Sequence, residues 1–307
     1  MSLNLGLMSN DVFIVVGPTA SGKTDFAISL AQKITGEIIT CDSTTIYQGF
    51  DVGTSKPTVY ERKLVPHHLI DVCHWSEKFD AGKYSDLAQK KIAEILLGKK
   101  KVIIAGGTGL YLRALLGENF HDLPSDLELR KTLDQFSNES LIEKLQGLDP
   151  KRASEIHARD RYRLLRAVEI CVLTGKTLAQ AASDRTHQQK PWKLFLIYLD
   201  PFLCDAKENV ISRTQAMLKS GFVEEVESLR LEGCPVAQKV MQSVGYREVN
   251  LFLDGFISAA ALPEKISQAT NQYARRQRTW FSSMRADLHL VGTRQNGLNF
   301  LKNCPYF

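Results

Sequence analysis

Gly17-Pro18-Thr19-Ala20-Ser21-Gly22-Lys23-Thr24 matches the pattern G-x-x-x-x-G-K-[ST] at every fixed position. It follows an apolar run, residues 12–16, short enough for a buried strand, and precedes residues 25–34, whose apolar residues form an imperfect helical stripe. In this strand–loop–helix context, backbone N–H groups converge on anionic oxygens and the helix dipole adds positive potential. The segment, called the phosphate loop below, therefore predicts phosphate binding, with Lys23 as a mobile cation and Thr24 as a ligand for Mg²⁺. A turn that merely joins strand to helix is the weaker alternative.

The composition suits a globular protein of two parts. The 307 residues are enough for about two domains, or for one core with a large insertion, and 44% hydrophobic residues can bury a sizeable core. A formal net charge of +5 permits a polyanionic partner without requiring one. The six cysteines include no C-x-x-C pair, which argues against a disulfide framework or a zinc site and for reduced thiols.

Membrane and export signals are absent from the sequence. No apolar run approaches the length that spans a bilayer, and the first residues lack the basic start and apolar segment of a signal peptide. We therefore expect a cytoplasmic protein with no membrane partner, and we expect it to be a monomer.

Two further segments are predicted to bring functional groups to the edge of the sheet that holds the phosphate loop. Residues 38–41 predict a second parallel strand, which places Asp42 at its carboxyl end, where ligands bind in open α/β sheets. Asp42 and Lys23 should then face one crevice, although Asp42 could equally cap the next turn. Residues 101–105 predict a third strand that ends in Gly106-Gly107-Thr108-Gly109. Nucleotide-hydrolysing enzymes with this loop usually have an acidic residue there.

This missing acid leaves Asp42 as the evident acidic group beside the phosphate loop. The glycines of residues 106–109 could let a substrate approach the backbone closely, with Thr108 donating a hydrogen bond. The alternative is a tight turn between a strand and a helix.

The sequence changes character between the third and fourth predicted strands. Residues 113–190 are typical of helices, and residues 194–200 resume the sheet. We therefore predict an α/β fold, with a P-loop NTPase-like parallel-sheet core and a mostly helical insertion domain. Residues 1–112 form the first part of the core, residues 113–190 form the helical insertion, and residues 191–307 form the second part with C-terminal helices.

The insertion contains a strongly basic segment. Residues 151–166 hold six Lys/Arg and two acidic residues. Arg159, Arg163 and Arg166 recur at helical spacing and should share one face of a helix. A second, mostly apolar face should carry Tyr162, Leu165, Val168 and Val172. A charged face is usually only solvated, but a nearly one-sign arginine face is better suited to phosphates, so we favour an RNA or DNA surface.

Two C-terminal segments also suggest contact with nucleic acid. Residues 273–281 interleave basic and aromatic side chains, which suits phosphate contact and base stacking, although a solvated helix with Trp280 and Phe281 buried is the alternative. Residues 243–248 predict a loop-to-helix junction that carries an exposed aromatic, Tyr246, and an arginine, Arg247.

These residues leave two principal functions and a third open. A small-molecule kinase would bind ATP in the phosphate loop, with Arg213 as a lid arginine and Asp42 as the base. A transferase acting on nucleic acid would instead hold a departing diphosphate there. A nucleic-acid-binding ATPase is the third possibility. The missing acidic strand end and the basic insertion favour the transferase.

Taken in order, the motifs resemble those of the tRNA dimethylallyltransferases, or tRNA isopentenyltransferases, of bacterial type. The resemblance covers about residues 11–282. It rests on the phosphate loop, Asp42-Ser43, residues 49–57 (G-F-D-V-G-T-S-K-P), residues 66–72, residues 106–111, Arg163-x-x-Arg166-Ala167, residues 244–246 and residues 273–281. No motif except the phosphate loop is specific alone, but their joint order is.

The resemblance implies transfer of a dimethylallyl group from dimethylallyl diphosphate to the exocyclic N6 of the adenosine on the 3′ side of a tRNA anticodon, with Mg²⁺ required. Asp42 then matches the general base, Lys23, Thr24 and Arg213 match groups that hold the diphosphate, and Thr108 matches a contact to the target nucleotide. Gly17, Pro18, Thr19, Ala20, Ser21, Gly22, Lys23 and Thr24 match the diphosphate loop as a whole.

The same resemblance implies that the tRNA anticodon stem-loop is the partner. Its contacts would be Asp42, Ser43, Thr44, Thr45, Thr108, Arg130, Tyr162, Arg163, Arg166, Gly245, Tyr246, Arg247, Arg275, Arg276, Gln277, Arg278 and Trp280. The sequence departs from the usual family pattern in three places. Tyr162 replaces a glutamine, Thr270-Asn271 replaces a Thr-Arg pair, and Thr44-Thr45 replaces a Met-Gln or similar pair.

Overall fold

The computed structural model describes residues 11–117, 123–183 and 192–304. The chain divides into two compact units, which are described separately. The larger unit comprises residues 1–115 and 190–307, and the helical unit comprises residues 116–189.

The larger unit is built on a parallel sheet of six strands, in the order β3-β2-β4-β1-β5-β6. The strands are β1 (Val12–Val16), β2 (Gly36–Thr40), β3 (His67–His68), β4 (Lys101–Gly106), β5 (Leu194–Asp200) and β6 (Leu288–Val291). Central strands of a parallel sheet are covered on both faces, which explains why β1 is apolar throughout and fully buried. The predicted α/β fold with a parallel sheet is confirmed. The sixth strand comes from a part of the sequence in which no pattern was recognised.

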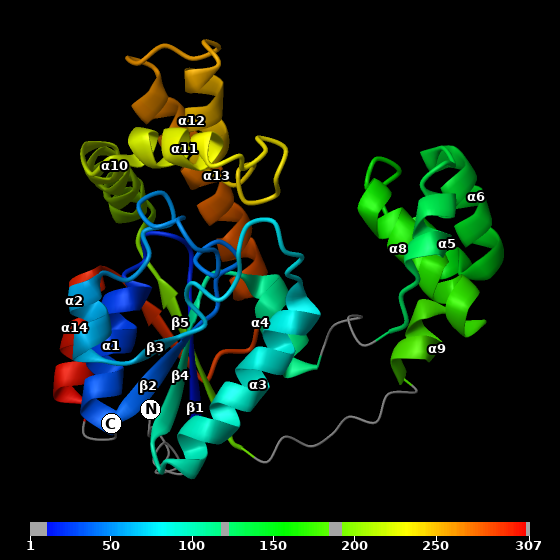
Figure 1. Ribbon diagram of the computed structural model, residues 1–307. Helices are drawn as coiled ribbons and strands as arrows, with labels where there is room; N and C mark the ends of the chain where they lie inside the picture. Colours follow the sequence, from blue (N-terminus) through cyan, green and yellow to red (C-terminus); the bar gives the residue numbers. More distant parts are fainter. Residues whose placement is uncertain (1–10, 118–122, 184–191, 305–307) are drawn as a thin grey trace. The chain divides into compact units, whose positions relative to one another are not determined.

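Helices cover both faces of this sheet (Figure 1). One side carries α1 (Lys23–Ile34) and α14 (Arg294–Asn303), and the other carries α3 (Ala81–Leu97) and α4 (Gly109–Leu116). Phe26 and Leu30 of α1 and Leu301 of α14 pack in one buried cluster with side chains of β1 and β4. The short α2 (Val59–Leu64) follows residues 49–57 and buries none of its side chains.

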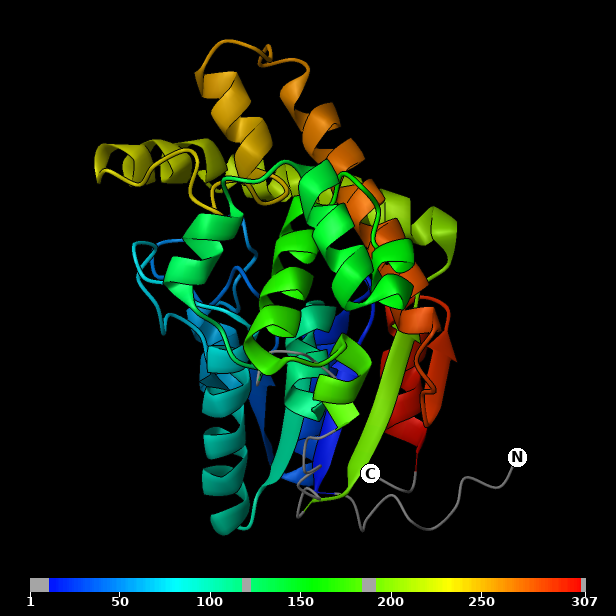
Figure 2. The same cartoon turned by 90° about the vertical axis from the view of Figure 1, so that its right-hand side faces the viewer.

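A further group of helices lies beyond the carboxyl ends of the strands (Figures 1 and 2). It comprises α10 (Leu203–Lys219), α11 (Phe222–Leu231), α12 (Tyr246–Leu253) and α13 (Leu262–Ser282). The chain leaves β1 and β4 through glycines because no side chain fits there. A Cβ on Gly17 would lie 2.4 Å from the Leu199 carbonyl oxygen, and one on Gly106 would lie 2.0 Å from that of Cys41.

The helical unit contains α5 (Leu127–Leu133), α6 (Asn138–Leu148), α7 (Pro150–Glu155), α8 (Arg161–Thr174) and α9 (Leu178–Ser183). Its own core includes Leu141 and Leu145 of α6 and Leu164 and Ile170 of α8, all fully buried. Side chains of aspartate or serine cap the N-termini of α5 to α8, which accounts for the close succession of short helices.

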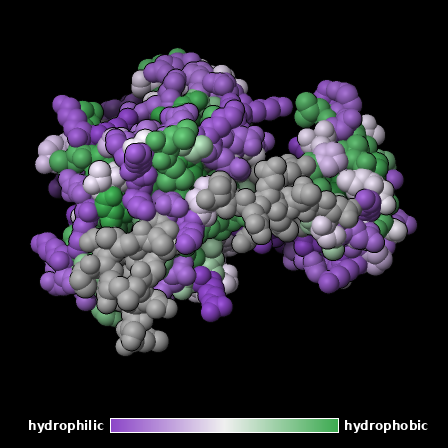
Figure 3. All heavy atoms as spheres, turned by 90° about the horizontal axis from the view of Figure 1, so that it is seen from below, coloured by the Kyte–Doolittle hydropathy of each residue, from purple (hydrophilic) through white to green (hydrophobic). Residues whose placement is uncertain are grey.

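Hydrophilic side chains predominate on the face shown in Figure 3, with smaller hydrophobic areas between them. None of the helices in the described ranges is long and apolar enough to cross a membrane.

Candidate active site

The phosphate loop opens into a cavity of about 350 Å³ at the carboxyl edge of the sheet. Its lining includes Asp42, Arg213 and Tyr273, together with loop residues 19–24. A second cavity of about 300 Å³ has apolar side chains from α10 and α13 in its lining. The two cavities share five lining residues, namely Thr19, Asp42, Thr54, Arg213 and Tyr273. The two cavities therefore meet at Asp42 and Arg213, and Lys23 lines the first cavity beside them.

The phosphate loop is shaped largely by its own backbone. Gly22 has the positive φ of 80° at the N-terminus of α1, and the Ser21 N–H donates to the Pro18 carbonyl oxygen at 3.3 Å. The Lys23 Nζ donates to the same carbonyl at 2.6 Å. Thr24, the second residue of α1, is exposed and lines the cavity. The loop has the geometry of a site for an anion at a helix N-terminus.

Burial makes Lys23 an unusual lysine. Burial, and next the positive charge of Arg213, lower the pKa of Lys23 to about 7, while the nearby Asp42 carboxylate opposes the shift. Burial also lowers the pKa of Arg213, again against the influence of Asp42. Two cations held close together in a desolvated site are stabilised by an anionic ligand, so this end of the cavity is suited to phosphate oxygens.

Asp42 serves both as a turn residue and as a lining group of the cavities. Its Oδ1 accepts hydrogen bonds from the Thr44 N–H at 2.8 Å and the Thr44 hydroxyl at 2.6 Å. The Thr108 hydroxyl oxygen accepts from the Ser43 N–H at 3.0 Å, and the Thr108 N–H donates to the Cys41 carbonyl at 3.1 Å. The two alternatives for Asp42 are therefore not exclusive, because one carboxylate oxygen fixes the turn while the residue lines both cavities.

Gln277 connects α13 to both glycine-containing turns of the site. Its Oε1 accepts from the Thr19 N–H at 2.8 Å, and its Nε2 donates to the Gly107 carbonyl oxygen at 2.8 Å. The side chain is buried, and both atoms of its amide group form hydrogen bonds within the protein. The sequence placed Gln277 among the tRNA contacts and contained no signal for this connection.

Comparison with known proteins supplies the family. The family profile described as IPP transferase matches residues 45–284, more than half of the chain. The chain is 37% identical over 281 residues to a tRNA dimethylallyltransferase 1 of Trichlorobacter lovleyi, covering 90% of this chain and 92% of that protein. It is 38% identical over 277 residues to a tRNA dimethylallyltransferase 1 of Pelobacter propionicus, covering 89% of each.

This chain belongs to the IPP transferase family.

Solved structures agree with this assignment. A tRNA isopentenylpyrophosphate transferase from Bacillus halodurans is similar with a TM-score of 0.70 and 31% identity, covering 95% of both chains. A eukaryotic dimethylallyltransferase acting on tRNA is similar with a TM-score of 0.81 and 25% identity, covering 92% of this chain and 74% of that one. The resemblance stated from the motifs is confirmed.

The structure of this IPP transferase corrects the expectation for Tyr246. Its side chain is only 1% exposed, so the prediction of an exposed aromatic is wrong. The hydroxyl donates to Glu225 Oε1 at 2.6 Å, and the ring packs against Phe222. The neighbouring Gly245 N–H donates to Glu248, and Arg247, whose side chain is 56% exposed, pairs with the same carboxylate at 2.7 Å.

The predicted arginine face of the insertion is wrong for Arg159. Asp160 caps α8, which begins at Arg161, so Arg159 precedes the helix and does not share a face with Arg163 and Arg166. Arg166 pairs with the buried Glu169 at 2.8 Å and donates to the carbonyl oxygens of residues 123 and 124.

Other arginines of the helical unit are also partly neutralised within it. Arg130 pairs with Glu169 at 2.7 Å, whereas Arg163 keeps 70% of its side chain exposed beside Asp160. The predicted apolar face is only partly buried, because Tyr162 is 72% and Val172 is 49% exposed. The pairing of Arg130 and Arg166 was not recognised because their acidic partner, Glu169, lies outside the basic segment.

The basic helix α13 of this IPP transferase has two kinds of side chain. Arg275 and Arg276 are exposed, whereas Arg278 pairs with Asp200 and donates to the Pro201 carbonyl at 2.6 Å. Trp280 is half-buried against Gly109, where a Cβ would lie 2.7 Å from the indole, and Phe281 is buried. The end of this helix therefore fits the alternative interpretation, in which Trp280 and Phe281 are buried at least in part.

Among the lining residues, Tyr273 and Arg294 were not selected from the sequence, and Thr45 was selected only as a tRNA contact. Tyr273 lies in both linings, and burial, followed by the Asp42 charge, raises its pKa to about 12, which keeps its hydroxyl protonated. Its position at the start of residues 273–281 was the available signal. The Thr45 hydroxyl, which the sequence placed only among tRNA contacts, is buried in the cavity lining without a partner among the described residues. Arg294 pairs with Asp25 at 2.6 Å and lies against Gly22, but its segment carried no recognisable motif.

Proposed function

We infer that this protein transfers a dimethylallyl group from dimethylallyl diphosphate to tRNA. The observation that carries the inference is that Asp42 and Arg213 line both cavities, while Lys23 lines the first cavity beside them. Membership of the IPP transferase family and the tRNA dimethylallyltransferases among its relatives support the same reaction over a small-molecule kinase. One cavity then receives the diphosphate and the other the acceptor nucleotide.

The acceptor in this proposal is the exocyclic N6 of the adenosine on the 3′ side of the anticodon. The bond between the allylic carbon and the diphosphate oxygen breaks, and a bond between that carbon and N6 forms. Lys23 and Arg213 stabilise the charge that develops on the departing diphosphate. Asp42 accepts the proton that N6 loses, because a carboxylate oxygen at the junction of the cavities is within reach of both substrates. The target base leaves its stack to enter the second cavity.

Mg²⁺ is part of the proposal as a cation that the protein and the diphosphate bind together. Within the described ranges no group of three or more His, Cys, Asp or Glu side chains could hold a metal by itself. The exposed Thr24 at the first turn of α1 suits an ion that takes most of its ligands from phosphate oxygens and water. Bound there, Mg²⁺ would neutralise charge on the diphosphate.

The tRNA would be held by exposed basic and aromatic side chains. In the larger unit these are Arg275 and Arg276 of α13 and Arg247 of α12. In the helical unit they are Arg163 and Tyr162 of α8. Such groups combine phosphate contact with stacking, which suits an anticodon stem-loop. The monomeric state and the cytoplasmic location stay predictions.

The test is incubation of the protein with unmodified tRNA, Mg²⁺ and labelled dimethylallyl diphosphate, followed by nucleoside analysis. Label should appear in N6-dimethylallyladenosine from the position next to the anticodon, without consumption of ATP. Asp42→Ala should abolish transfer and leave tRNA binding nearly intact, whereas Asp86→Ala, on the exposed face of α3, should transfer normally. Normal turnover by Asp42→Ala would reject the base assignment, and ATP hydrolysis coupled to modification would restore the kinase interpretation.

A further inference from the structure

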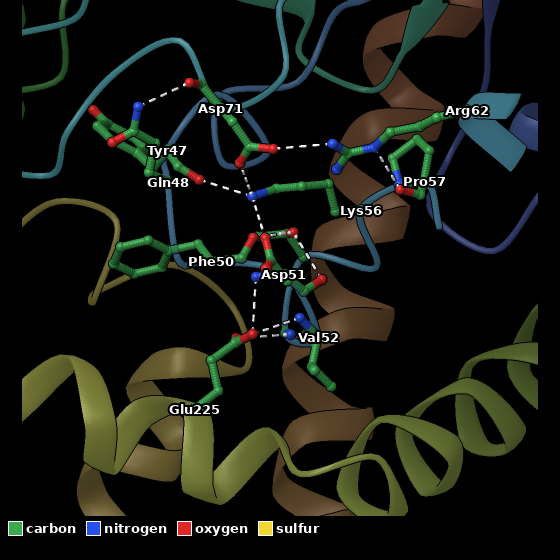
Figure 4. A network of polar contacts seen from close by, with 12 residues as sticks. Tyr47, Gln48, Phe50, Asp51, Val52, Lys56, Pro57, Arg62, Asp71 and Glu225 are labelled. Atoms are coloured by element: carbon green, nitrogen blue, oxygen red, sulfur yellow. Dashed lines mark hydrogen bonds and ion pairs between the residues drawn. The ribbon is translucent and has the colours of Figure 1, made fainter. Parts of the chain in front are cut away.

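The segment from Gly49 to Pro57, called the second loop below, is fixed by a lysine on one side (Figure 4). The Lys56 side chain is 2% exposed. Its Nζ donates to the Tyr47 carbonyl oxygen at 2.8 Å and to Asp71 Oδ1 at 2.6 Å, and it also pairs with Asp51. A buried ammonium with three oxygen partners gives this segment one conformation, because any displacement would leave the charge uncompensated.

A carboxylate from α11 fixes the same loop on the other side (Figure 4). Glu225 accepts from the backbone N–H groups of Asp51 at 2.8 Å, Val52 at 2.6 Å and Gly53 at 3.1 Å. It also accepts from the Tyr246 hydroxyl at 2.6 Å. Four donors converge on one carboxylate, and each such charge-assisted bond is stronger than a neutral one.

Close packing also fixes the backbone of the second loop. A Cβ on Gly53 would lie 2.1 Å from the Phe222 ring and 2.6 Å from the Tyr246 ring, so the backbone passes directly over both aromatics. These rings belong to the starts of α11 and α12, which also supply Glu225 and the Tyr246 hydroxyl. The loop is therefore fitted to this helix pair by shape as well as by charge.

Thr54, which directly follows the three residues bound by Glu225, contacts the active site. The Thr54 carbonyl oxygen lies 3.4 Å from Arg213 Nη2, and Thr54 lies in the lining of both cavities. The Thr54 hydroxyl donates to the Phe50 carbonyl at 2.7 Å, which ties this residue back to the second loop. A half-buried guanidinium is oriented by the few acceptors that it meets, so the position of this carbonyl affects where Arg213 points.

We propose that Glu225 and Lys56 are positioning residues for the transfer reaction, because they hold the Thr54 carbonyl where it directs Arg213 toward the diphosphate. Neither side chain lies in the lining of the two cavities, so each acts through the second loop. The proposal rests on the proposed function, which gives Arg213 its role at the diphosphate.

The first experiment compares Glu225→Gln with Glu224→Gln, the same change at an exposed neighbour on α11. Glutamine keeps the side-chain volume and one accepting oxygen, but its amide nitrogen cannot accept hydrogen bonds. The donors that bind the replaced oxygen of Glu225 therefore lose their acceptor. Single-turnover transfer should slow by about tenfold in Glu225→Gln, in line with a small misplacement of a charged group, and stay unchanged in Glu224→Gln. Equal rates in the two variants would overturn the proposal.

The second experiment asks whether Glu225 acts through Arg213. In an Arg213→Ala background, Glu225→Gln should cause no further loss of rate, because the side chain that it positions is gone. Tyr246→Phe removes one of the four donors and should show a smaller loss with the same dependence on Arg213, which keeps the test available if Glu225→Gln folds poorly. An equal fold-loss from Glu225→Gln with and without Arg213 would mean a general structural role and overturn the inference.

Failure of the proposed function would give a different result. If Arg213→Ala alone transferred at the wild-type rate, the role of Arg213 at the diphosphate would be wrong, and the positioning role of Glu225 would be rejected with it. If Arg213→Ala lowers the rate but the two losses multiply independently, only the positioning role is rejected.

Discussion

The phosphate loop and the second loop both lie beside the same cavity, but they are stabilised in different ways. The phosphate loop uses contacts within six residues, from Lys23 and Ser21 to the Pro18 carbonyl, and Gln277 is a long-range partner. The second loop is fixed mainly by side chains distant in sequence, with Glu225 lying 174 residues from Asp51. The comparison indicates that the phosphate loop forms the anion site, while the second loop is built to hold a neighbouring side chain in place. Variants in the phosphate loop should therefore lower activity without lowering stability, whereas variants in the second loop should lower both.

The largest expected effect is on activity, in the phosphate loop. Lys23→Ala should lower single-turnover transfer by about a thousandfold, the usual scale for removing a group that stabilises developing charge. Stability should not fall, because the variant removes a desolvated cation. Thermal unfolding and transfer rate, measured together, check this. Lys63→Ala, an exposed lysine on α2, is the control, and a large stability loss in Lys23→Ala would contradict the contrast between the loops.

In the second loop we expect a loss of stability together with a smaller loss of transfer rate than in Lys23→Ala. Lys56→Met should lower the free energy of unfolding by about 2 kcal/mol, because Asp51 and Asp71 lose their buried partner while remaining partly exposed themselves. Urea unfolding with a constant m-value would measure it. An unfolding curve identical to that of the wild type would show that the buried lysine does not stabilise the loop.

A pH dependence should belong to the phosphate loop alone. In the protein without substrate the pKa of Lys23 is about 7, so its side chain is largely neutral at higher pH. A bound diphosphate favours the protonated form. Binding then takes up a proton, and the KM for dimethylallyl diphosphate should rise as pH increases above about 7, by up to about tenfold per pH unit. Calorimetry in buffers of different ionisation heat would detect the proton. Lys56→Met should keep this dependence and Lys23→Ala should lose it, so a persistent rise in Lys23→Ala would exclude Lys23 as its source.

The smallest effect concerns the hydrogen bonds that Gln277 makes to the phosphate loop and to the turn after β4. Gln277→Ala leaves the Thr19 N–H and the Gly107 carbonyl without their shared partner and should raise the KM for dimethylallyl diphosphate by about fivefold, the scale of one hydrogen bond. Gln272→Ala, exposed on the same helix, is the control. A change in the KM for tRNA alone would instead favour the original expectation that Gln277 contacts tRNA.

Local features were predictable because their causes are local. The phosphate loop, the buried strands β1 and β4 and most helices of both units follow from periodicity, glycine positions and capping residues. Asp42 could be placed at the ligand-binding edge because residues after parallel strands share that edge. The arginines of α8 were misjudged for the complementary reason, since Glu169, buried in the unit's core, neutralises Arg130 and Arg166.

The sequence by itself determined the parallel-sheet class, the phosphate loop and the residues that resemble an IPP transferase. Only the tertiary structure decided that Tyr246 turns inward to Glu225, that Gln277 joins the phosphate loop to β4, and that Thr54 meets Arg213. Backbone hydrogen bonds and side-chain periodicity act over a few residues and leave a pattern in the sequence. Contacts of buried polar side chains satisfy groups that lie far apart in the chain, and no spacing records them.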